Sequence, residues 1–142
     1  MTARIQVTFD AASPPELGRF WAEVLGYVED SPPAPFSTWE ECLDAMGVPL
    51  EERDSAYAVV DPEGVGPRLW FQKVPEQKAG KNRVHLDVNV AVDLPREQRP
   101  DAVRARAAEL EGLGARRLYE KEENGGFWVT LQDPEGNEFC VQ

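Results

Sequence analysis

The tetrapeptide Asp-Pro-Glu-Gly occurs twice in this chain of 142 residues, at positions 61–64 and 133–136. The offset is 133 − 61 = 72 positions, about half of the chain. An Asp-Pro pair favours a turn because proline presets a backbone torsion, and the following glycine adopts a positive φ at no steric cost. An apolar run precedes and follows each copy, so each copy predicts a β-hairpin. A repeat at half length predicts two similar modules.

Strand patterns accompany both hairpins. Residues 5–9 and 84–90 alternate apolar and polar side chains, which is typical of a strand with one apolar face. A strand at 27–29 and a charged, exposed strand at 116–122 are expected before the hairpins. The first half also contains a short helix at 38–46, which reads as an insertion between strands, a place where binding loops often lie.

One helix is predicted in each half. Ser13, Pro14 and a glutamate two positions later favour a helix start with a capping box, and Gly26 ends the apolar stripe that follows. Asp101 is the predicted N-cap of the second helix, which Gly114 ends. The predicted order is therefore β-α-β-β-β, twice. We expect one domain, 1–142, with module one at 1–76, a connector at 77–82 and module two at 83–142.

Composition excludes several classes of function. The formal net charge of −11 argues against nucleic acid or an anionic membrane as partner, because both require a basic patch. The chain lacks an apolar run long enough to span a membrane, and residues 1–7 enter a strand pattern directly, so a cytoplasmic protein is expected. Cys42 and Cys140 form no spaced framework and are expected to be reduced thiols. His85 is the one histidine, which excludes a site with two imidazoles.

The alternation also predicts a face that is polar and aromatic at once. If the helices cover the apolar faces of the strands, the opposite face gathers amides, hydroxyls, carboxylates, a histidine and two tryptophans. Apolar walls with a few convergent polar groups are typical of a ligand cleft. A wet sheet face or a dimer contact are the alternatives. The candidate ligand-binding residues are Gln6, Thr8, Trp70, Gln72, His85, Asp87, Trp128 and Cys140.

Four motifs carry a resemblance to a known family: the segments 7–10 (VTFD), 20–27 (FWAEVLGY), 85–88 (HLDV) and 133–137 (DPEGN). Together they resemble the vicinal oxygen chelate superfamily, which contains glyoxalase I, bleomycin-resistance proteins and extradiol dioxygenases, and more narrowly its short glyoxalase-like proteins. The resemblance covers nearly the whole chain. It implies an α+β fold of two tandem βαβββ modules whose curled mixed sheets surround a cavity, with helices on the outer face, and it implies a homodimer.

The resemblance also raises the question of a metal. Metal-using members place one ligand on the first and last strand of each module. Here Gln6 and His85 stand at the first-strand positions, Gln72 or Trp70 at the third, and Cys140 where those members carry glutamate. Divalent ions are held by imidazole, carboxylate or thiolate, and a neutral amide oxygen is a weak donor. We therefore expect no metal and no other cofactor. Two alternatives remain: His85 and Cys140 with two amides, or Glu138 brought in by a bulge.

The function expected is that of a small-molecule-binding protein without the family's full metal site. The alternative is a metal-dependent lyase, isomerase or dioxygenase, and no motif decides between binding and catalysis. His85 is interpreted as a ligand contact, a general base or a structural histidine. Trp70 and Trp128 either stack on a planar ligand or pack as walls. Asp87 is expected to be solvated, since residues two apart on a strand touch weakly, and Cys140 to be an inert thiol.

Overall fold

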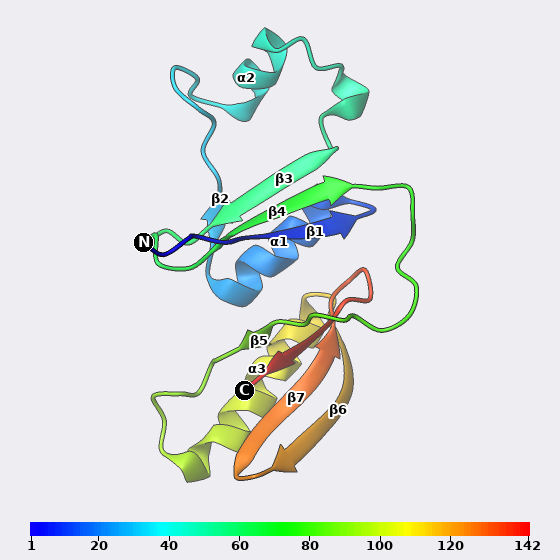
Figure 1. Cartoon of the computed structure of the whole chain (residues 1–142). Coiled ribbons are helices and arrows are strands. Elements are labelled where there is room, and N and C mark those ends of the chain that lie inside the picture. The colour runs from blue at the N-terminus through cyan, green and yellow to red at the C-terminus, as the bar shows by residue number, and fades with distance from the viewer. The chain divides into compact units, whose positions relative to one another are not determined.

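The computed structural model describes residues 1–142, which form two compact units, Met1–Gln77 and Lys78–Gln142. Each unit contains one four-stranded sheet that combines a parallel strand pair with antiparallel pairs (Figure 1). The chain is therefore α+β with two tandem modules, as predicted. None of its helices combines the length and the apolar character that a membrane crossing requires.

The first unit follows the predicted order, with an insertion after its second strand. Its elements are β1 (Gln6–Ala11), α1 (Pro14–Leu25), β2 (Val28–Glu29), α2 (Trp39–Ala45), the 3-10 helix η1 (Leu50–Glu52), β3 (Ala56–Val60) and β4 (Arg68–Lys73). The strand order in the sheet is β1-β4-β3-β2. β1 runs parallel to β4, and the predicted hairpin pairs β3 with β4 antiparallel.

The second unit repeats this topology. Its elements are β5 (Asp87–Val88), the 3-10 helix η2 (Arg96–Gln98), α3 (Arg99–Gly112), β6 (Arg116–Glu123), β7 (Gly126–Gln132) and β8 (Glu138–Val141). The strand order β5-β8-β7-β6 matches β1-β4-β3-β2 element for element, again with the first and last strands parallel. Both Asp-Pro-Glu-Gly turns join the antiparallel pair that the repeat predicted.

Helix α1 forms where the sequence indicates. Pro14 occupies the first turn, where its missing N–H costs no hydrogen bond, and Gly26 adopts the left-handed conformation (φ 69°) that closes the helix. The Ser13 side chain makes no capping hydrogen bond, so the predicted capping box does not form. The apolar stripe of the helix is buried, and Trp21, 1% exposed, lies with its ring centroid 5.2 Å from that of Phe9 on β1.

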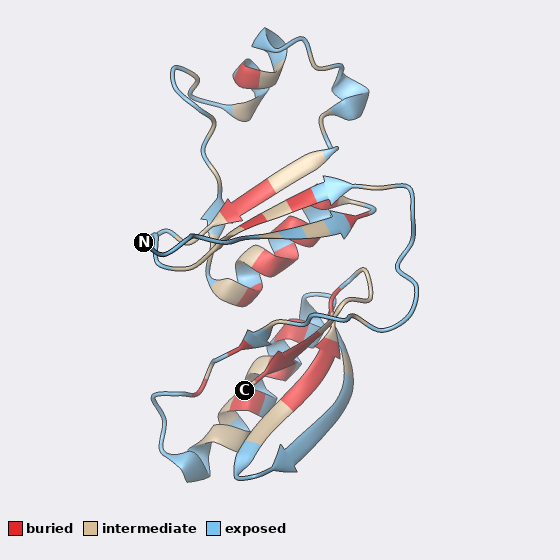
Figure 2. Cartoon of the chain, in the orientation of Figure 1, coloured by how far each residue is buried: buried red, intermediate tan, exposed pale blue.

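Buried side chains of each unit lie where its helix meets its sheet (Figure 2). In the first unit Leu69 and Phe71 of β4 are almost fully buried, and in the second Phe139 and Val141 of β8 are fully buried. The alternation therefore predicted the apolar faces correctly. Burying each such side chain contributes about 1.5–3 kcal/mol to the free energy of unfolding.

Three boundary predictions are wrong. Helix α3 begins at Arg99, with Gln98 as its N-cap, so Asp101 lies inside the first turn rather than before the helix. The strand expected over 84–90 is regular only at Asp87–Val88, because residues 83–84 bend. Ile5 and Val84, which were expected on the apolar faces, are 73% and 80% exposed because both precede the paired part of their strand.

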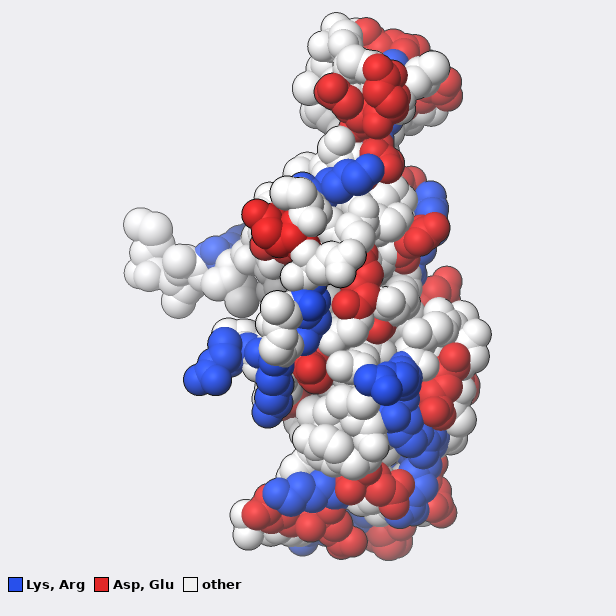
Figure 3. Space-filling view, turned by 90° about the vertical axis from the view of Figure 1, so that its right-hand side faces the viewer, with Lys and Arg blue, Asp and Glu red and all other residues white.

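The insertion in the first unit contains α2 and η1. Thr38 and Glu41 form a capping box, in which the Thr38 hydroxyl accepts from the backbone amide of Glu41 at 3.2 Å. Six acidic residues and a single basic one, Arg53, lie between positions 40 and 54. Figure 3 shows these acidic side chains gathered over this segment. The insertion thus presents an acidic surface to solvent.

Candidate functional site

One face of the first sheet carries the predicted residues of that module. The strand register places Thr8 opposite Trp70 and Asp10 opposite Gln72, so these side chains share a face. Gln6 lies on the same face, two residues before Thr8. Trp70 is half-buried and the other side chains are exposed.

Arg68 organises this face. Its Nη1 donates to the Gln6 side-chain oxygen at 2.8 Å, and its Nε pairs with the Asp30 carboxylate at 2.8 Å. The guanidinium also lies 4.9 Å from the centre of the Trp70 ring, a cation–π contact. The amide of Gln6 is therefore already engaged, which agrees with its interpretation as a hydrogen-bonding group.

The strand pairing settles which residue of β4 corresponds to Cys140. Val59, two residues before the first Asp-Pro turn, pairs with Leu69. Leu131, two residues before the second turn, pairs with Phe139. Trp70 is therefore the equivalent of Cys140, and Gln72 is not. The third family ligand position holds an indole, which cannot ligate a metal.

A pocket of about 340 Å³ lies in the second unit. It is lined by all four residues that the sequence predicted for this module, namely His85, Asp87, Trp128 and Cys140. They come from the segment before β5, from β5, from β7 and from β8, which the pairing of Asp87 with Cys140 and of Thr130 with Cys140 brings side by side. We call this the Trp128 pocket. Its size and its mixture of ring and polar groups suit part of a small molecule.

A hydrogen-bonded cluster forms the polar wall of the Trp128 pocket. His85 Nε2 lies 3.3 Å from the Asp87 carboxylate, and Cys140 Sγ lies 3.4 Å from the Thr130 hydroxyl. Asp87 is exposed, as expected, but it is not separate from His85. Burial, and in addition the negative charge of Asp87, raise the pKa of the Cys140 thiol, so the thiol is protonated at neutral pH. A protonated thiol is not a nucleophile, as the sequence analysis expected.

The donor atoms of this cluster also suit one class of metal ion. One ligand atom each from His85, Asp87 and Cys140 lies within 4.8 Å of the others. An imidazole nitrogen, a carboxylate oxygen and a thiolate sulfur fit Zn²⁺, whereas Mg²⁺ and Ca²⁺ prefer oxygen ligands alone. Such an ion would have to displace the thiol proton. Asp87 stands at none of the family's ligand positions, so it was not among the expected donors.

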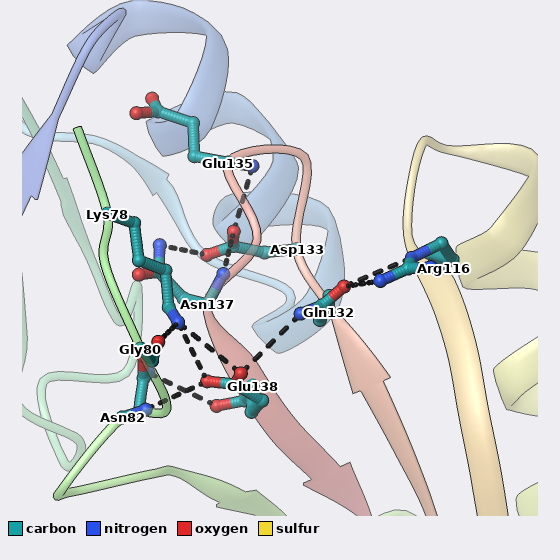
Figure 4. A network of polar contacts seen from close by, with 9 residues as sticks. All are labelled: Lys78, Gly80, Asn82, Arg116, Gln132, Asp133, Glu135, Asn137 and Glu138. Atoms are coloured by element: carbon teal, nitrogen blue, oxygen red, sulfur yellow. Dashed lines mark hydrogen bonds and ion pairs between the residues drawn. The ribbon is translucent and has the colours of Figure 1, made fainter.

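Glu138 does not join that cluster, because other groups hold its carboxylate. Figure 4 shows the network around this carboxylate: the backbone amide of Asn82 donates to the carboxylate at 3.0 Å, and Lys78 Nζ lies 3.2 Å from it. Burial alone would raise its pKa, but these hydrogen bonds and the lysine charge lower the pKa of Glu138 to about 2. The Gln132 side chain, which Arg116 binds, approaches the same carboxylate at 3.5 Å. These neighbours therefore hold the carboxylate of Glu138 in place at the first residue of β8.

Sequence reasoning missed several residues that line the Trp128 pocket, among them Gln142, Lys81, Tyr119 and Lys121. The last two lie on β6, which was interpreted only as a charged, exposed strand. Asn124-Gly125, both with positive φ, forms the two-residue turn between β6 and β7. That turn places Lys121 opposite Trp128 and Tyr119 opposite Thr130, so the Asn-Gly signal could have found both. Lys121 Nζ lies 5.7 Å from the Trp128 ring centre.

The family model described as "Glyoxalase-like domain" matches residues 6–142, nearly the whole chain. No curated protein matches the chain in sequence. Solved structures do match in fold, at low sequence identity.

Three of these structures illustrate the range. Fosfomycin resistance protein FosX from Mesorhizobium loti superposes with a TM-score of 0.63 at 15% identity, covering 100% of this chain and 91% of that chain. A Listeria monocytogenes FosX variant complexed with Mn(II) and dihydroxypropylphosphonic acid gives 0.64 at 9% identity, with 100% and 90% coverage. The Streptomyces verticillus bleomycin-binding protein, complexed with copper(II)-bleomycin, gives 0.55 at 16% identity, with 100% and 96% coverage. At such identities the likeness shows the fold alone.

Proposed function

Because the chain belongs to the glyoxalase-like domain family of the vicinal oxygen chelate superfamily, we propose that it is a small-molecule-binding protein whose ligand occupies the Trp128 pocket. One observation carries the proposal: four residues chosen from the sequence as ligand contacts line a single pocket in the second unit. The bleomycin-binding protein among the fold neighbours is named for binding rather than for catalysis.

The pocket's lining indicates the chemistry of the ligand. Trp128 and Tyr119 supply ring surfaces for a planar group, against which stacking contributes about 0.5–1.5 kcal/mol beyond burial. The side chain of His85 is 47% exposed, and because Nε2 faces Asp87, Nδ1 is the imidazole nitrogen that can accept from or donate to a ligand. Lys81 makes no ion pair or hydrogen bond within the protein and offers a cation. A planar ring with a polar substituent fits this lining. In the first unit Gln6, Thr8, Trp70 and Gln72 stay predicted ligand contacts.

A ligand screen tests the proposal. Small aromatic metabolites and aromatic antibiotics are screened for a rise in melting temperature, since a ligand that binds only the folded state stabilises it. A hit should shift the Trp128 indole resonance in a proton–nitrogen NMR spectrum. Trp128→Leu should weaken binding by about tenfold or more, corresponding to about 1.4 kcal/mol. Trp39→Phe, in the insertion, is the control and should leave the affinity unchanged.

Either of two results would overturn the proposal. The first is a broad screen in which no compound raises the melting temperature of the full chain, and the second is a set of hits that bind Trp128→Leu and the parent protein equally. In the second case the ligand lies elsewhere, and the Trp128 pocket is an ordinary indentation of a wet sheet face.

A second candidate function is metal-dependent catalysis, which the cluster of His85, Asp87 and Cys140 favours. A bound divalent ion would supply a Lewis acid that polarises an oxygen of the substrate. The residues would hold the ion, and Trp128 would still orient the substrate's ring. Metal analysis of protein purified without chelator discriminates between the two functions. A stoichiometric ion that is lost in His85→Ala would refute the proposal that the protein binds its ligand without a metal.

The homodimer and the cytoplasmic location stay predictions. A homodimer would give a mass of about twice 15.9 kDa in light scattering of the purified chain. A monomeric mass at micromolar concentration would contradict it.

A further inference from the structure

A second and larger pocket, of about 730 Å³, lies in the second unit. It is formed by the segment 89–100, which follows β5, and by the tight turn that joins β6 to β7. Arg96 and Arg99 line it together with Phe127 and Gln142. We call it the Arg96 pocket. No residue that lines this pocket was among the candidate ligand-binding residues of the sequence.

Backbone carbonyl oxygens hold both arginines in place. Arg96 donates from Nε at 3.1 Å and from Nη2 at 2.8 Å to the carbonyl of Gly125. Arg99 donates from Nε to the Leu94 carbonyl at 2.9 Å and from Nη2 to the Val92 carbonyl at 3.0 Å. The Nη1 group of each guanidinium makes no hydrogen bond within the protein. Each side chain is therefore fixed but retains N–H groups for another partner.

The charges of these two arginines are not neutralised. A carbonyl is a neutral partner, and neither guanidinium forms an ion pair. Three other arginines of this module do form ion pairs with carboxylates, namely Arg104, Arg106 and Arg117. Glu97 and Glu122 also line the pocket, but both are exposed and neither pairs with Arg96 or Arg99.

The Arg96 pocket and the Trp128 pocket share one lining residue. Gln142, the last residue after β8, lines both pockets, and its side-chain amide donates to Asn89 at 3.0 Å. Asn89 continues the polar face of the strand segment that holds His85 and Asp87. A ligand that contacts Gln142 from either pocket would border the lining of both.

We propose that the Arg96 pocket is an oxyanion subsite, which binds the carboxylate or phosphate end of an elongated ligand through the guanidinium groups of Arg96 and Arg99. Planar guanidinium groups match both oxyanions in geometry, and such charge-assisted hydrogen bonds are about twice as strong as neutral ones. The elongated ligand rests on the proposed function, since its ring would occupy the Trp128 pocket. The oxyanion subsite itself rests only on the two arginines and their pocket.

NMR titration of the full chain tests the subsite with three probes: inorganic phosphate, benzoate and the uncharged benzamide. Phosphate and benzoate should shift the backbone amide signals of Arg96 and Gly125, and benzamide should not. Arg96→Gln and Arg99→Gln should each weaken phosphate binding by about tenfold, because a charged hydrogen-bond donor is lost. Arg106→Gln removes the same charge from another part of α3, where Arg106 pairs with Glu109, and should leave the phosphate titration unchanged.

Three results would overturn the subsite: no shift at Arg96 or Gly125 with either anion, equal phosphate binding in all variants, or equal weakening in Arg106→Gln. These results are distinct from a failure of the proposed function. If phosphate shifts the Arg96 pocket and no ring compound shifts the Trp128 indole, the subsite stands and the proposed function falls. If benzoate shifts only the Trp128 indole and phosphate shifts no signal of the Arg96 pocket, the proposed function stands and the subsite falls.

Discussion

His85 Nε2 lies 3.3 Å from Oδ1 of Asp87, although the two residues are only two apart in the chain. On a regular strand both side chains would stand upright on the same face and touch weakly. Here the paired part of β5 begins at Asp87, and residues 83–84 bend, so His85 precedes the regular strand. The departure from regular geometry brings an imidazole and a carboxylate beside the Cys140 thiol, and it creates the one three-donor cluster of this structure.

Because of this contact, the affinity of the cluster for a metal ion should depend on Asp87. If the cluster binds Zn²⁺, Asp87→Asn should weaken the ion's binding by about tenfold or more, because a neutral amide replaces an anionic ligand. Equilibrium dialysis with Zn²⁺ followed by elemental analysis measures this. Asp93→Asn, in the exposed loop after β5, is the matched control. Equal zinc content in the parent and in Asp87→Asn would show that the cluster is not the metal site.

Glu138 should make the stability of the second unit depend on pH. Its folded pKa of about 2 lies below the ordinary value of 4.5, so its contribution is complete above pH 4.5 and is lost as the pH falls toward 2. Glu138→Gln should therefore destabilise the protein at pH 7 by about 1–3 kcal/mol. Urea unfolding at pH 7 and pH 3 should show a smaller loss on acidification for this variant than for the parent.

Glu63→Gln is the control for that measurement, since its exposed side chain lies in the first Asp-Pro-Glu-Gly turn. It should follow the parent's pH dependence. If Glu138→Gln did the same, the network around Glu138 would contribute nothing to stability.

Two helical glycines should respond to alanine with opposite signs. A Cβ on Gly18 of α1 would lie 2.2 Å from Cδ1 of Tyr57, so Gly18→Ala should destabilise by about 1–3 kcal/mol through overpacking. A Cβ on Gly112, the last residue of α3, would meet no atom within 4 Å. Gly112→Ala should stabilise by about 0.5–1 kcal/mol through lower unfolded-state entropy. Thermal unfolding of both variants checks this, and a shared sign would contradict the packing of α1 on β3.

Core packing of β8 should dominate the stability of the second unit. Phe139 is fully buried, so Phe139→Ala should cost about 3–5 kcal/mol, from lost burial and the cavity that remains. Val65→Ala, where the side chain is 86% exposed, should change the free energy of unfolding by less than about 0.5 kcal/mol. Chemical denaturation measures both. A cost below that of an exposed position would mean that β8 is not packed as described.

The order of elements and the faces of the strands could be predicted from the sequence because they depend on local signals. The duplicated Asp-Pro-Glu-Gly turn gives two hairpins, and Pro14 and Gly26 bound α1 as expected. Alternation placed Phe71 and Phe139 inside and His85 on the polar side. Turn propensity and the alternation of buried and exposed residues along a strand depend on residues close together in the chain, so both can be predicted from the sequence.

The tertiary structure alone decided what those faces become. Whether Trp70 or Gln72 matches Cys140 depends on the hydrogen-bond register across two strands, which loop length alone left open. The contact of Asp87 with His85 depends on where the regular part of β5 begins. The pocket around Arg96 depends on a loop that returns to a distant turn at Gly125. Pairing register and loop closure are set by contacts between residues far apart in the chain, and periodicity does not encode them.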